Sequence, residues 1–419
     1  MKENTLSVCP VCASVVEAEI EKKEGRVSMS KRCALHGEFE TVISTDSEFY
    51  ELMRSNRDRS CEEKFAGTEK YLESDYHLEN AREVYIDVTE KCNLTCAQCF
   101  SNANKGHDRF LPKETIMGFI PRLKKVMPKV GLCGGEPTLH EDLPEIIARY
   151  SAEGFTVRLL TNGLRLAEEG YLEKLAKAGL RWVILQFDGF NDETYKLFRG
   201  RPLSEIKEKV IRKLSENKIN VILAVMVSRG VNSNEMYDII RYAMKIPHIV
   251  QVAFLPCANQ GRHLLDEKTM SIPEVFDELE RTTGSKISRE DFLASQGLAR
   301  TLWKFFGIQQ YKPRTCHLGM YYFHDDEVEI SFHRVLSPLF MLKNLKRLPK
   351  ILAVLWHIVR WDKSAYHPNL LGVVIERFRD ARDIDLMEAT NCHKGYITEN
   401  GIVPNCIYNT LTRVNRAGA

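Results

Sequence analysis

The hydrophobic pattern of residues 81–262 alternates between short apolar runs and longer stretches with helical spacing. The apolar runs are rich in Val, Ile and Leu without clean alternation, which is typical of parallel strands buried on both faces. Glycines follow two of the helical stretches, Gly154 and Gly179, and suit left-handed helix ends. This repeat predicts an α/β fold in which a parallel sheet curls into a partial (β/α)6 barrel. The predicted strands are 83–88, 129–133, 156–160, 181–187, 220–227 and 249–254.

Unusual residues follow each predicted strand. In chain order the segments are "TEKCNLTCAQCF", "GGEPT", "TNG", "DG" (with Gln186 at the end of its strand), "SRGVN" and "LPCANQGR". A glycine pair alone usually marks only a tight turn. Here six such segments fall at the carboxyl ends of strands, where α/β barrels build their active sites. We therefore expect one site at this edge of the sheet.

Three cysteines in the first of these segments, Cys92, Cys96 and Cys99, follow a C-x3-C-x2-C pattern ending at Phe100. A closed zinc site and a saturated four-iron cluster both take four ligands. Three thiolates can hold three irons of a [4Fe–4S] cluster and leave the fourth iron open for a chelating amine and carboxylate. The alternative is a plain zinc knuckle.

The next segments supply groups suited to such a partner. Gly134 and Gly135 allow a close backbone approach, and Glu136 can accept hydrogen bonds from an ammonium group. Thr161 and Asn162 could bind ribose hydroxyls.

These motifs together resemble the radical S-adenosylmethionine (SAM) superfamily over residues 81–262. The resemblance implies that SAM chelates the unique iron and is cleaved by one electron to a 5′-deoxyadenosyl radical, which takes hydrogen from an unactivated C–H bond. Cys92, Cys96 and Cys99 would be the catalytic cluster ligands. The candidate cofactor-binding residues are Phe100, Gly134, Gly135, Glu136, Pro137, Thr161, Asn162, Gln186 and Asp188.

The N-terminus has the spacing of a metal ribbon. Cys9 and Cys12 form C-x2-C, and Cys33 and His36 form C-x2-H after 20 intervening residues. We predict a tetrahedral zinc or mononuclear iron site that holds together a domain of about 45 residues with little core of its own. The alternative is free buried cysteines beside a surface histidine.

The C-terminal part carries four scattered cysteines, Cys257, Cys316, Cys392 and Cys406. The last two flank a predicted hairpin turn at 399–401, which resembles the cysteine hairpin of radical SAM enzymes with auxiliary clusters. The count fits one auxiliary [4Fe–4S] cluster, and four ordinary thiols are the alternative.

Residues 330–361 contain basic and large apolar side chains but no acid. This pattern is typical of an interfacial helix on anionic lipid, and Pro349 should divide it into two pieces. Two core-packed amphipathic helices with solvated lysines are the alternative.

Several phrases resemble one branch of the superfamily, the archaeal tetraether lipid synthases and their relatives. They include "KRCALHGEFE", "LQFDGFNDETYKLFRG" and "FRDARDIDLMEATNCHKG". The resemblance implies an N-terminal mononuclear metal site, auxiliary clusters and C–C bond formation on a lipid. The chain departs from that branch in two places: residues 60–83 contain only Cys61, and no cysteine follows Phe292 where the branch has some. We therefore expect at least one auxiliary cluster to be absent.

The composition bears on the expected partners and on the cellular compartment. The 59 basic and 57 acidic residues leave no net charge that would favour nucleic acid, and no apolar run reaches the ~18 residues of a spanning helix. Twelve cysteines without a signal peptide point to metal ligands in a reducing compartment. We expect a cytoplasmic protein, with peripheral contact at the inner face of the membrane as an alternative. The expected domains are a ribbon (1–45), a linker (46–80), the barrel (81–262) and a C-terminal substrate and auxiliary-cluster region of α+β type (263–419).

The leading hypothesis is a radical SAM enzyme of transferase or oxidoreductase type that attacks C–H bonds of a lipid or other apolar substrate. It would receive electrons from a flavodoxin- or ferredoxin-type donor. A peptide or cofactor maturase is the second hypothesis. A non-catalytic iron–sulfur binding protein is the third, and the intact "GGEP" and "TNG" segments argue against it.

Overall fold

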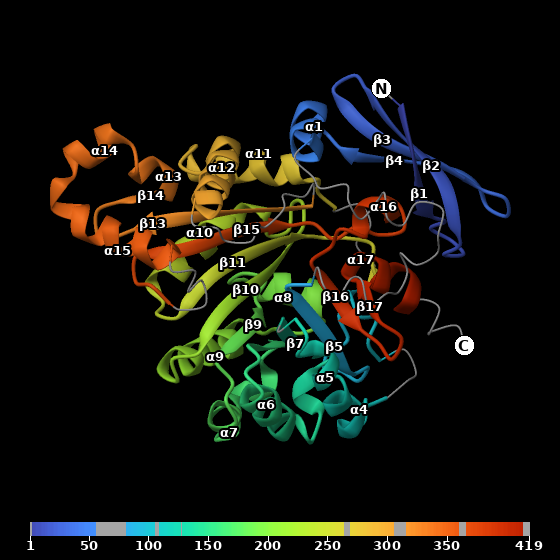
Figure 1. Ribbon diagram of the computed structural model, residues 1–419, viewed down its shortest axis with the longest axis horizontal. Coiled ribbons are helices and arrows are strands. Elements are labelled where there is room, and N and C mark those ends of the chain that lie inside the picture. Colours follow the sequence, from blue (N-terminus) through green and yellow to red (C-terminus); the bar gives the residue numbers. More distant parts are fainter. Residues whose placement is uncertain are drawn as a thin grey trace.

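A computed structural model describes residues 2–55, 81–104, 109–126, 128–263, 269–305, 316–359 and 366–413. Its centre is a sheet in which all six predicted barrel strands run parallel (Figure 1). They are β5 Glu83–Thr89, β7 Lys129–Gly134, β8 Val157–Thr161, β9 Trp182–Gln186, β10 Asn220–Val227 and β11 Ile249–Pro256. The predicted strands are thus confirmed to within two residues at each end.

Helices follow the strands and cover one face of the sheet, where they bury the largest apolar cluster of the chain. They are α4 Lys113–Gly118, α5 Ile120–Leu123, α6 Leu143–Ala152, α7 Tyr171–Lys177, α8 Asp192–Arg199, α9 Ser204–Glu216 and α10 Met236–Lys245, with the 3-10 turns η2 Pro137–Leu139, η3 Leu164–Ala167 and η4 Ser233–Glu235. Helix α8 shows why these segments are helical. The Asn191 side chain accepts a hydrogen bond from the backbone N–H of Glu193 at its start, and Gly200 ends it in the left-handed conformation.

The C-terminal region extends the same sheet at both edges. The sheet has eleven strands in the order β14-β13-β15-β11-β10-β9-β8-β7-β5-β16-β17. The strands β13 His317–His324, β14 Glu329–Ser331 and β15 Leu370–Glu376 continue it beyond β11, and β16 Lys394–Ile397 and β17 Ile402–Pro404 continue it beyond β5. The predicted hairpin turn at 399–401 joins β16 and β17. The expected α+β extension is therefore continuous with the barrel sheet.

Helices accompany these added strands. Two of them, α11 Ile272–Thr283 and α12 Arg289–Phe305, pack beside the barrel, and α16 Leu386–Ala389, α17 Asn405–Ile407 and the π-helix η7 Tyr408–Thr412 lie near the C-terminus. An arm formed by α13 Phe332–Val335, α14 Pro338–Lys343, the 3-10 turn η6 Leu345–Arg347 and α15 Leu348–Val359 projects at the far end (Figure 1). Pro349 lies in the first turn of α15 and breaks no helix; the segment is divided into four helical pieces rather than the two expected.

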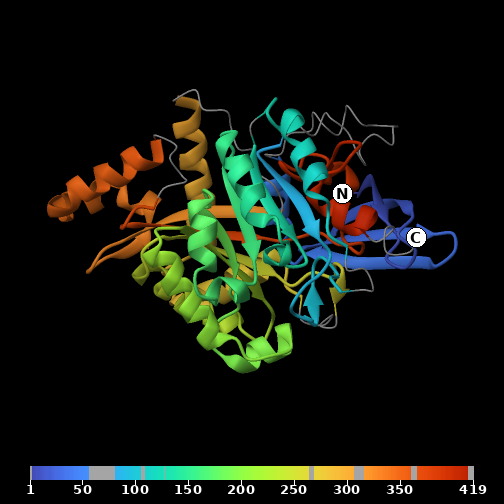
Figure 2. The same cartoon turned by 90° about the horizontal axis from the view of Figure 1, so that it is seen from below.

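The N-terminal ribbon is a separate four-stranded antiparallel sheet of β1 Lys2–Val8, β2 Val15–Lys23, β3 Arg26–Cys33 and β4 Gly37–Ser44. It lies at the opposite end of the molecule from the arm (Figure 2). It docks on residues 381–385: Ser7 Oγ donates to the Ile384 carbonyl, and the buried Lys31 ammonium donates to the Ala381 and Arg382 carbonyls. The range expected as a linker begins with helix α1 Ser47–Ser55, and residues 56–80, including Cys61, lie outside the described residues.

Candidate functional site

The cluster loop, residues 90–104, leaves the carboxyl end of β5 and is fixed by its own side chains. Asn104 accepts a hydrogen bond from the Cys92 N–H at 2.8 Å and donates to the carbonyls of Cys92 and Leu94. Cys96 is buried, and Cys92 and Cys99 are partly buried beside Leu94 and Tyr195. Burial raises the pKa of the Cys92 thiol to about 12, so its thiolate needs a cation to stabilise it. An iron ion of the expected cluster would supply that charge.

The loop after β11 clamps the cluster loop from the other side. A two-residue strand, β6 Gln98–Cys99, pairs with β12 Arg262–His263, and Arg262 Nε donates to the Cys96 carbonyl at 2.6 Å. A Cβ at Gly261 would lie 2.3 Å from the Cys99 carbonyl oxygen, so this contact requires glycine. The "ANQGR" segment therefore positions the cysteines.

The glycines of "GGEP" serve a close backbone contact with the cluster loop. Gly135 N–H donates to the Thr89 carbonyl at 2.7 Å, and Glu136 N–H donates to the Lys91 carbonyl at 2.8 Å. A Cβ on Gly134 would lie 2.1 Å from the Thr89 oxygen, and one on Gly135 would lie 2.2 Å from the Lys91 oxygen. The close approach expected at these glycines is present, and it is made to protein backbone.

Glu136 joins the second and third loops. Its buried carboxylate accepts hydrogen bonds from Thr138 Oγ1 (2.6 Å), Thr161 Oγ1 (2.7 Å) and the Asn162 N–H (2.8 Å). Burial raises the pKa of Glu136, and these donors oppose the shift. Protein donors thus already occupy most of the acceptor positions of the Glu136 carboxylate. An ammonium group would have to share this carboxylate with them. Pro137 is buried as the first residue of η2.

Asn162 faces the cysteines. Its Nδ2 lies 3.9 Å from Cys92 Sγ and 2.7 Å from Asn93 Oδ1. Phe100, at the end of the motif, stacks at a tilt on Phe378 from the C-terminal region, with ring centroids 4.8 Å apart. The predicted site residues of the first three loops therefore lie around one edge of the sheet, as the strand order requires.

Asp188 and Gln186 form the part of the site after the fourth strand, and Asp188 has Arg199 as a charged partner. Arg199, at the end of α8, makes a bidentate ion pair with the fully buried Asp188 carboxylate at 2.7 and 2.8 Å. Gln186 Nε2 also donates to Asp188. Asp188 and the Cys96 thiol both raise the pKa of Arg199, which opposes the effect of burial. From the sequence, Arg199 could reach a phosphate or a carboxylate, with a surface ion pair as the commoner outcome; its partner is a carboxylate, and the pair is buried.

Lys207 is a residue that the sequence reading missed. Its ammonium is buried and donates to the Asn162 carbonyl (2.5 Å), the Gln186 carbonyl (2.7 Å) and Gln186 Oε1 (2.6 Å). Burial lowers the pKa of Lys207 to about 7. One signal could have identified it: Lys207 lies three and four residues before Val210 and Ile211, on the apolar stripe of α9.

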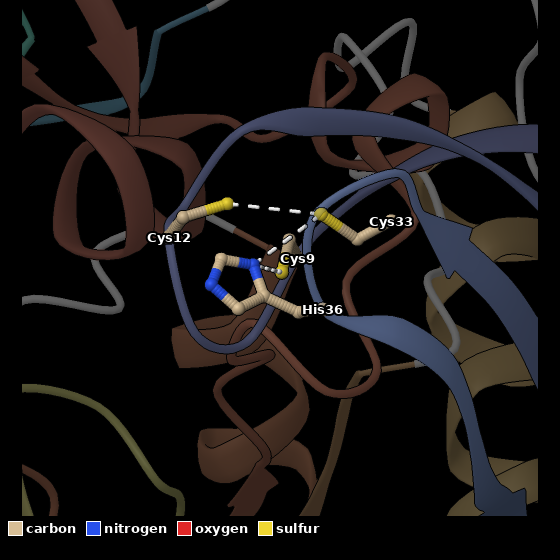
Figure 3. A group of neighbouring side chains, drawn as sticks. All are labelled: Cys9, Cys12, Cys33 and His36. Atoms are coloured by element: carbon tan, nitrogen blue, oxygen red, sulfur yellow. Dashed lines mark hydrogen bonds between the residues drawn. The ribbon is translucent and has the colours of Figure 1, made fainter.

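The predicted ribbon ligands converge (Figure 3). Cys12 and Cys33 sulfurs are 3.9 Å apart, and His36 Nδ1 lies 3.7 Å from Cys9 Sγ and 3.5 Å from Cys33 Sγ. Zinc–sulfur bonds of about 2.3 Å and a zinc–nitrogen bond of about 2.0 Å place tetrahedral ligands about 3.8 Å (S···S) and about 3.5 Å (S···N) apart. The four side chains therefore fit a single zinc ion, with Nδ1 as the histidine ligand.

Among the residues that the structure describes, this is the one group with three or more such ligand atoms within 4.8 Å of one another. The sulfurs of Cys92, Cys96 and Cys99 are not all within 4.8 Å of one another, although their charges interact. Their wider spacing favours a polynuclear cluster over the zinc knuckle considered from the sequence.

Three of the four C-terminal cysteines gather behind the β16–β17 hairpin. The charges of Cys316 and Cys392 both act on the buried Cys406, whose sulfur accepts a hydrogen bond from the Arg379 N–H at 3.4 Å. Cys257 is buried at the end of β11, where its N–H donates to the Val227 carbonyl. Cys316, Cys392 and Cys406 are thus near enough for their charges to interact, but their sulfurs are not all within 4.8 Å of one another.

Comparisons with known proteins agree with this organisation. The family model described as "Radical SAM superfamily" matches residues 86–243, and "HMPTM N-terminal zinc ribbon domain" matches residues 1–45. The 7,8-dihydro-6-hydroxymethylpterin dimethyltransferase of Methanocaldococcus jannaschii is 30% identical over 485 residues, covering 99% of this chain and 94% of that protein. A probable GTP 3′,8-cyclase of Pyrococcus horikoshii is 32% identical over 168 residues, 40% of this chain and 54% of its own length.

Solved structures give a weaker likeness. SuiB of Streptococcus suis bound to S-adenosylmethionine has a TM-score of 0.43 and 16% identity, covering 48% of this chain and 47% of that chain. The radical SAM resemblance drawn from the sequence is confirmed. The narrower expectations of a tetraether lipid synthase and a lipid substrate have no support, because the relative that matches from end to end is named for a pterin.

Proposed function

The chain belongs to the radical SAM superfamily and to the family of the M. jannaschii pterin dimethyltransferase, and on that premise we propose that it is a radical SAM methyltransferase acting on a reduced pterin. One observation carries the proposal. The similarity extends through the ribbon, the barrel and the C-terminal region, whereas the similarity to the GTP cyclase covers 40% of the chain. The C-terminal region, which borders the site, is therefore shared with the pterin enzyme.

The chain's own residues fit the cofactors that this family uses. We assign Cys92, Cys96 and Cys99 to the [4Fe–4S] cluster, since Cys96 is buried, Cys92 and Cys99 are partly buried beside it, and the charges of the three thiols interact. A cluster with one open iron supplies the single electron that cleaves bound SAM reductively. The polar groups of Asn162 and Glu136 would bind and orient SAM, and the buried neighbours of the loop would exclude water.

A second cofactor proposal concerns Cys316, Cys392 and Cys406. We assign them to an auxiliary iron–sulfur site, because the charges of Cys316 and Cys392 act on Cys406, whose sulfur accepts a hydrogen bond from the Arg379 N–H. The positive charge of the buried Arg379 guanidinium, which interacts with Cys316, would offset part of the negative charge of the thiolates. Cys257 remains the candidate fourth ligand. Iron counts on wild type and Cys406→Ser test the assignment: about four irons should be lost with this substitution, and an unchanged count would contradict it.

A separate proposal concerns the arm formed by α13–α15. Its exposed apolar side chains are each more than half accessible: Leu339, Leu342, Leu345, Leu352 and Trp356. No acidic residue occurs between 330 and 359, and three lysines accompany these side chains. Lys346 and Lys350 pair with Glu327 and Asp325, which leaves Lys343 beside the exposed apolar side chains. From the apolar side chains and the absence of acids among them we propose peripheral contact with an anionic lipid surface. Among the described residues, no helix is long and apolar enough to span a membrane.

Vesicle flotation tests the arm. Wild-type protein should float with phosphatidylglycerol vesicles, and the double variant Leu342→Glu with Trp356→Glu should not. Val42→Glu introduces the same charge at an exposed apolar position of the ribbon, 44% accessible, and should behave as wild type. Equal flotation of all three proteins, or of none, would remove the proposed contact.

The enzymatic proposal is tested by an anaerobic assay with 6-hydroxymethyl-7,8-dihydropterin, SAM and a low-potential reductant of the flavodoxin or ferredoxin type. The pterin should stimulate release of 5′-deoxyadenosine and should gain one or two methyl groups in the presence of a suitable methyl donor, as measured by mass spectrometry. Cleavage of SAM that no pterin stimulates would contradict the pterin substrate while leaving the radical SAM activity intact.

A further inference from the structure

A cavity of about 630 Å³ lies between the barrel and the C-terminal segment. Its walls come from the ends of β5 and β7, the cluster loop, the β16–β17 turn and the π-helix η7. The volume is typical of sites for small organic ligands. Gly134 and Gly135 belong to its wall, so a ligand in the cavity would lie directly beside the proposed SAM site.

A hydrogen-bond acceptor, Asp87, and a donor, Arg413, lie next to each other in the wall of this cavity. The Asp87 carboxylate accepts hydrogen bonds from Tyr408 Oη at 2.9 Å and from Arg413. Its other oxygen has only the weak Cys133 thiol at 3.3 Å as a donor. That oxygen therefore keeps the capacity to accept from a ligand N–H.

Arg413 keeps an unused donor. Its Nη1 is buried and has no hydrogen-bond partner among the residues that the structure describes. The guanidinium lies over the rings of Tyr396 and Tyr408, 5.3 and 5.2 Å from their centroids, and these two rings stack on each other. The stack fixes the plane of the guanidinium, so Nη1 cannot turn away to find another acceptor. A buried donor without a partner destabilises the protein unless a ligand satisfies it.

We infer that Asp87 and Arg413 bind the 2-aminopyrimidin-4-one edge of a pterin, an assignment that rests on the proposed function. This edge presents N–H donors beside a carbonyl acceptor. The donors match the free Asp87 oxygen, and the carbonyl matches Arg413 Nη1. Because the Asp87–Arg413 pair is neutral as a whole, the cavity favours a neutral heterocycle over an anion.

The same ring edge occurs in GTP, the substrate named for the shorter relatives, so the ring chemistry alone does not separate the two ligands. The distinction lies in the remainder of the molecule, since GTP carries a triphosphate. In the cavity, Glu90 and Glu399 accompany the single exposed arginine Arg109. Two carboxylates against one cation disfavour a triphosphate, which supports the pterin.

Anaerobic binding measurements on the reconstituted holoenzyme with SAM test this assignment. The probes are 6-hydroxymethyl-7,8-dihydropterin and the matching lumazine, in which an oxygen replaces the 2-amino group. Wild type should prefer the pterin by about tenfold or more, as expected for a hydrogen bond to a charged group. Asp87→Asn should lose this preference. Arg413→Met should weaken both ligands equally and keep the preference, because both carry the 4-carbonyl.

The control is Asp325→Asn, which disrupts a comparably buried ion pair with Arg347 in the arm, far from the cavity. It should bind both probes as wild type does. If a cavity variant does not fold, the wild-type preference still decides the matter, because equal affinity for pterin and lumazine overturns the assignment.

Failure of the proposed subsite can be distinguished from failure of the proposed function. Pterin binding by wild type that both cavity variants retain would overturn the Asp87–Arg413 subsite and leave the proposed function standing. Absence of pterin binding by wild type, together with no stimulation of SAM cleavage, would overturn the proposed function and the subsite with it.

Discussion

Replacing Arg199 by methionine is expected to destabilise the barrel and to weaken SAM binding together. The substitution removes two short hydrogen bonds to Asp188, a carboxylate with no solvent exposure. Breaking one side of a buried ion pair costs about 3–5 kcal/mol. Gln186 and the Met226 N–H still donate to Asp188, so the lower end, about 3 kcal/mol, is expected. This is equivalent to roughly a hundredfold larger unfolded fraction.

The assay is thermal unfolding of the anaerobically reconstituted enzyme, combined with reductive SAM cleavage in which KM and kcat are separated. The melting temperature should fall and KM for SAM should rise. A double variant, Arg199→Met with Asp188→Asn, should recover part of the lost stability because no buried charge remains unpaired. Asp325→Asn is the matched control: it should lower stability without changing KM. An Arg199→Met enzyme with wild-type melting temperature and KM would refute the reasoning.

Three further substitutions give separate results. Gly135→Ala places a methyl group against the Lys91 carbonyl and should abolish the SAM-bound cluster signal in electron paramagnetic resonance, whereas Gly118→Ala, with open space around it, should not. Cys33→Ser should reduce the zinc-to-protein ratio, measured by mass spectrometry of metals, and lower the melting temperature; an unchanged ratio would contradict the ribbon site. Lys207→Met removes the donor to three oxygens of Asn162 and Gln186 and should cost about 2–3 kcal/mol. The folded-state pKa of Lys207 lies near 7, whereas an unfolded lysine stays protonated well above that pH. In that range the unfolded chain binds one proton more than the folded chain. The free energy of unfolding of wild type, relative to that of Lys207→Met, should therefore increase as pH rises from about 7. A constant difference across this range in denaturant titrations would contradict the buried ammonium.

Much of the barrel and the metal ligands could be predicted from the sequence, because their signals are local. Buried parallel strands produce apolar runs, and ribbon ligands follow a fixed spacing that the converging Cys9, Cys12, Cys33 and His36 bear out. The placement of β15 beside β11 could not be predicted, since more than a hundred residues separate them and no local pattern specifies the partner. The inward turn of Arg199 depends on how α8 ends against the cluster loop, which is likewise a tertiary property.

The expectation of a lipid substrate found no support, for a related reason. The phrases that resemble tetraether lipid synthases lie in the ribbon, the barrel and residues 376–409, where Phe378 stacks on Phe100 of the cysteine motif. Such segments carry information about the shared chemistry rather than the substrate. The residues proposed to contact substrate, Asp87 and Arg413, are 326 positions apart and form no recognisable motif.

The docking of the ribbon on residues 381–385 has a consequence for how the protein is made. Ser7 bonds to a carbonyl 377 positions later, and β16 flanks the first barrel strand only after residue 394 has been synthesised. The N-terminal end of the chain must therefore remain undocked while nearly all of the protein leaves the ribosome. A bound zinc ion would keep the ribbon folded during that interval, when its own small core has nothing to pack against. Metal supply at the start of synthesis would then limit the yield of active enzyme, independently of any role for zinc in the finished site.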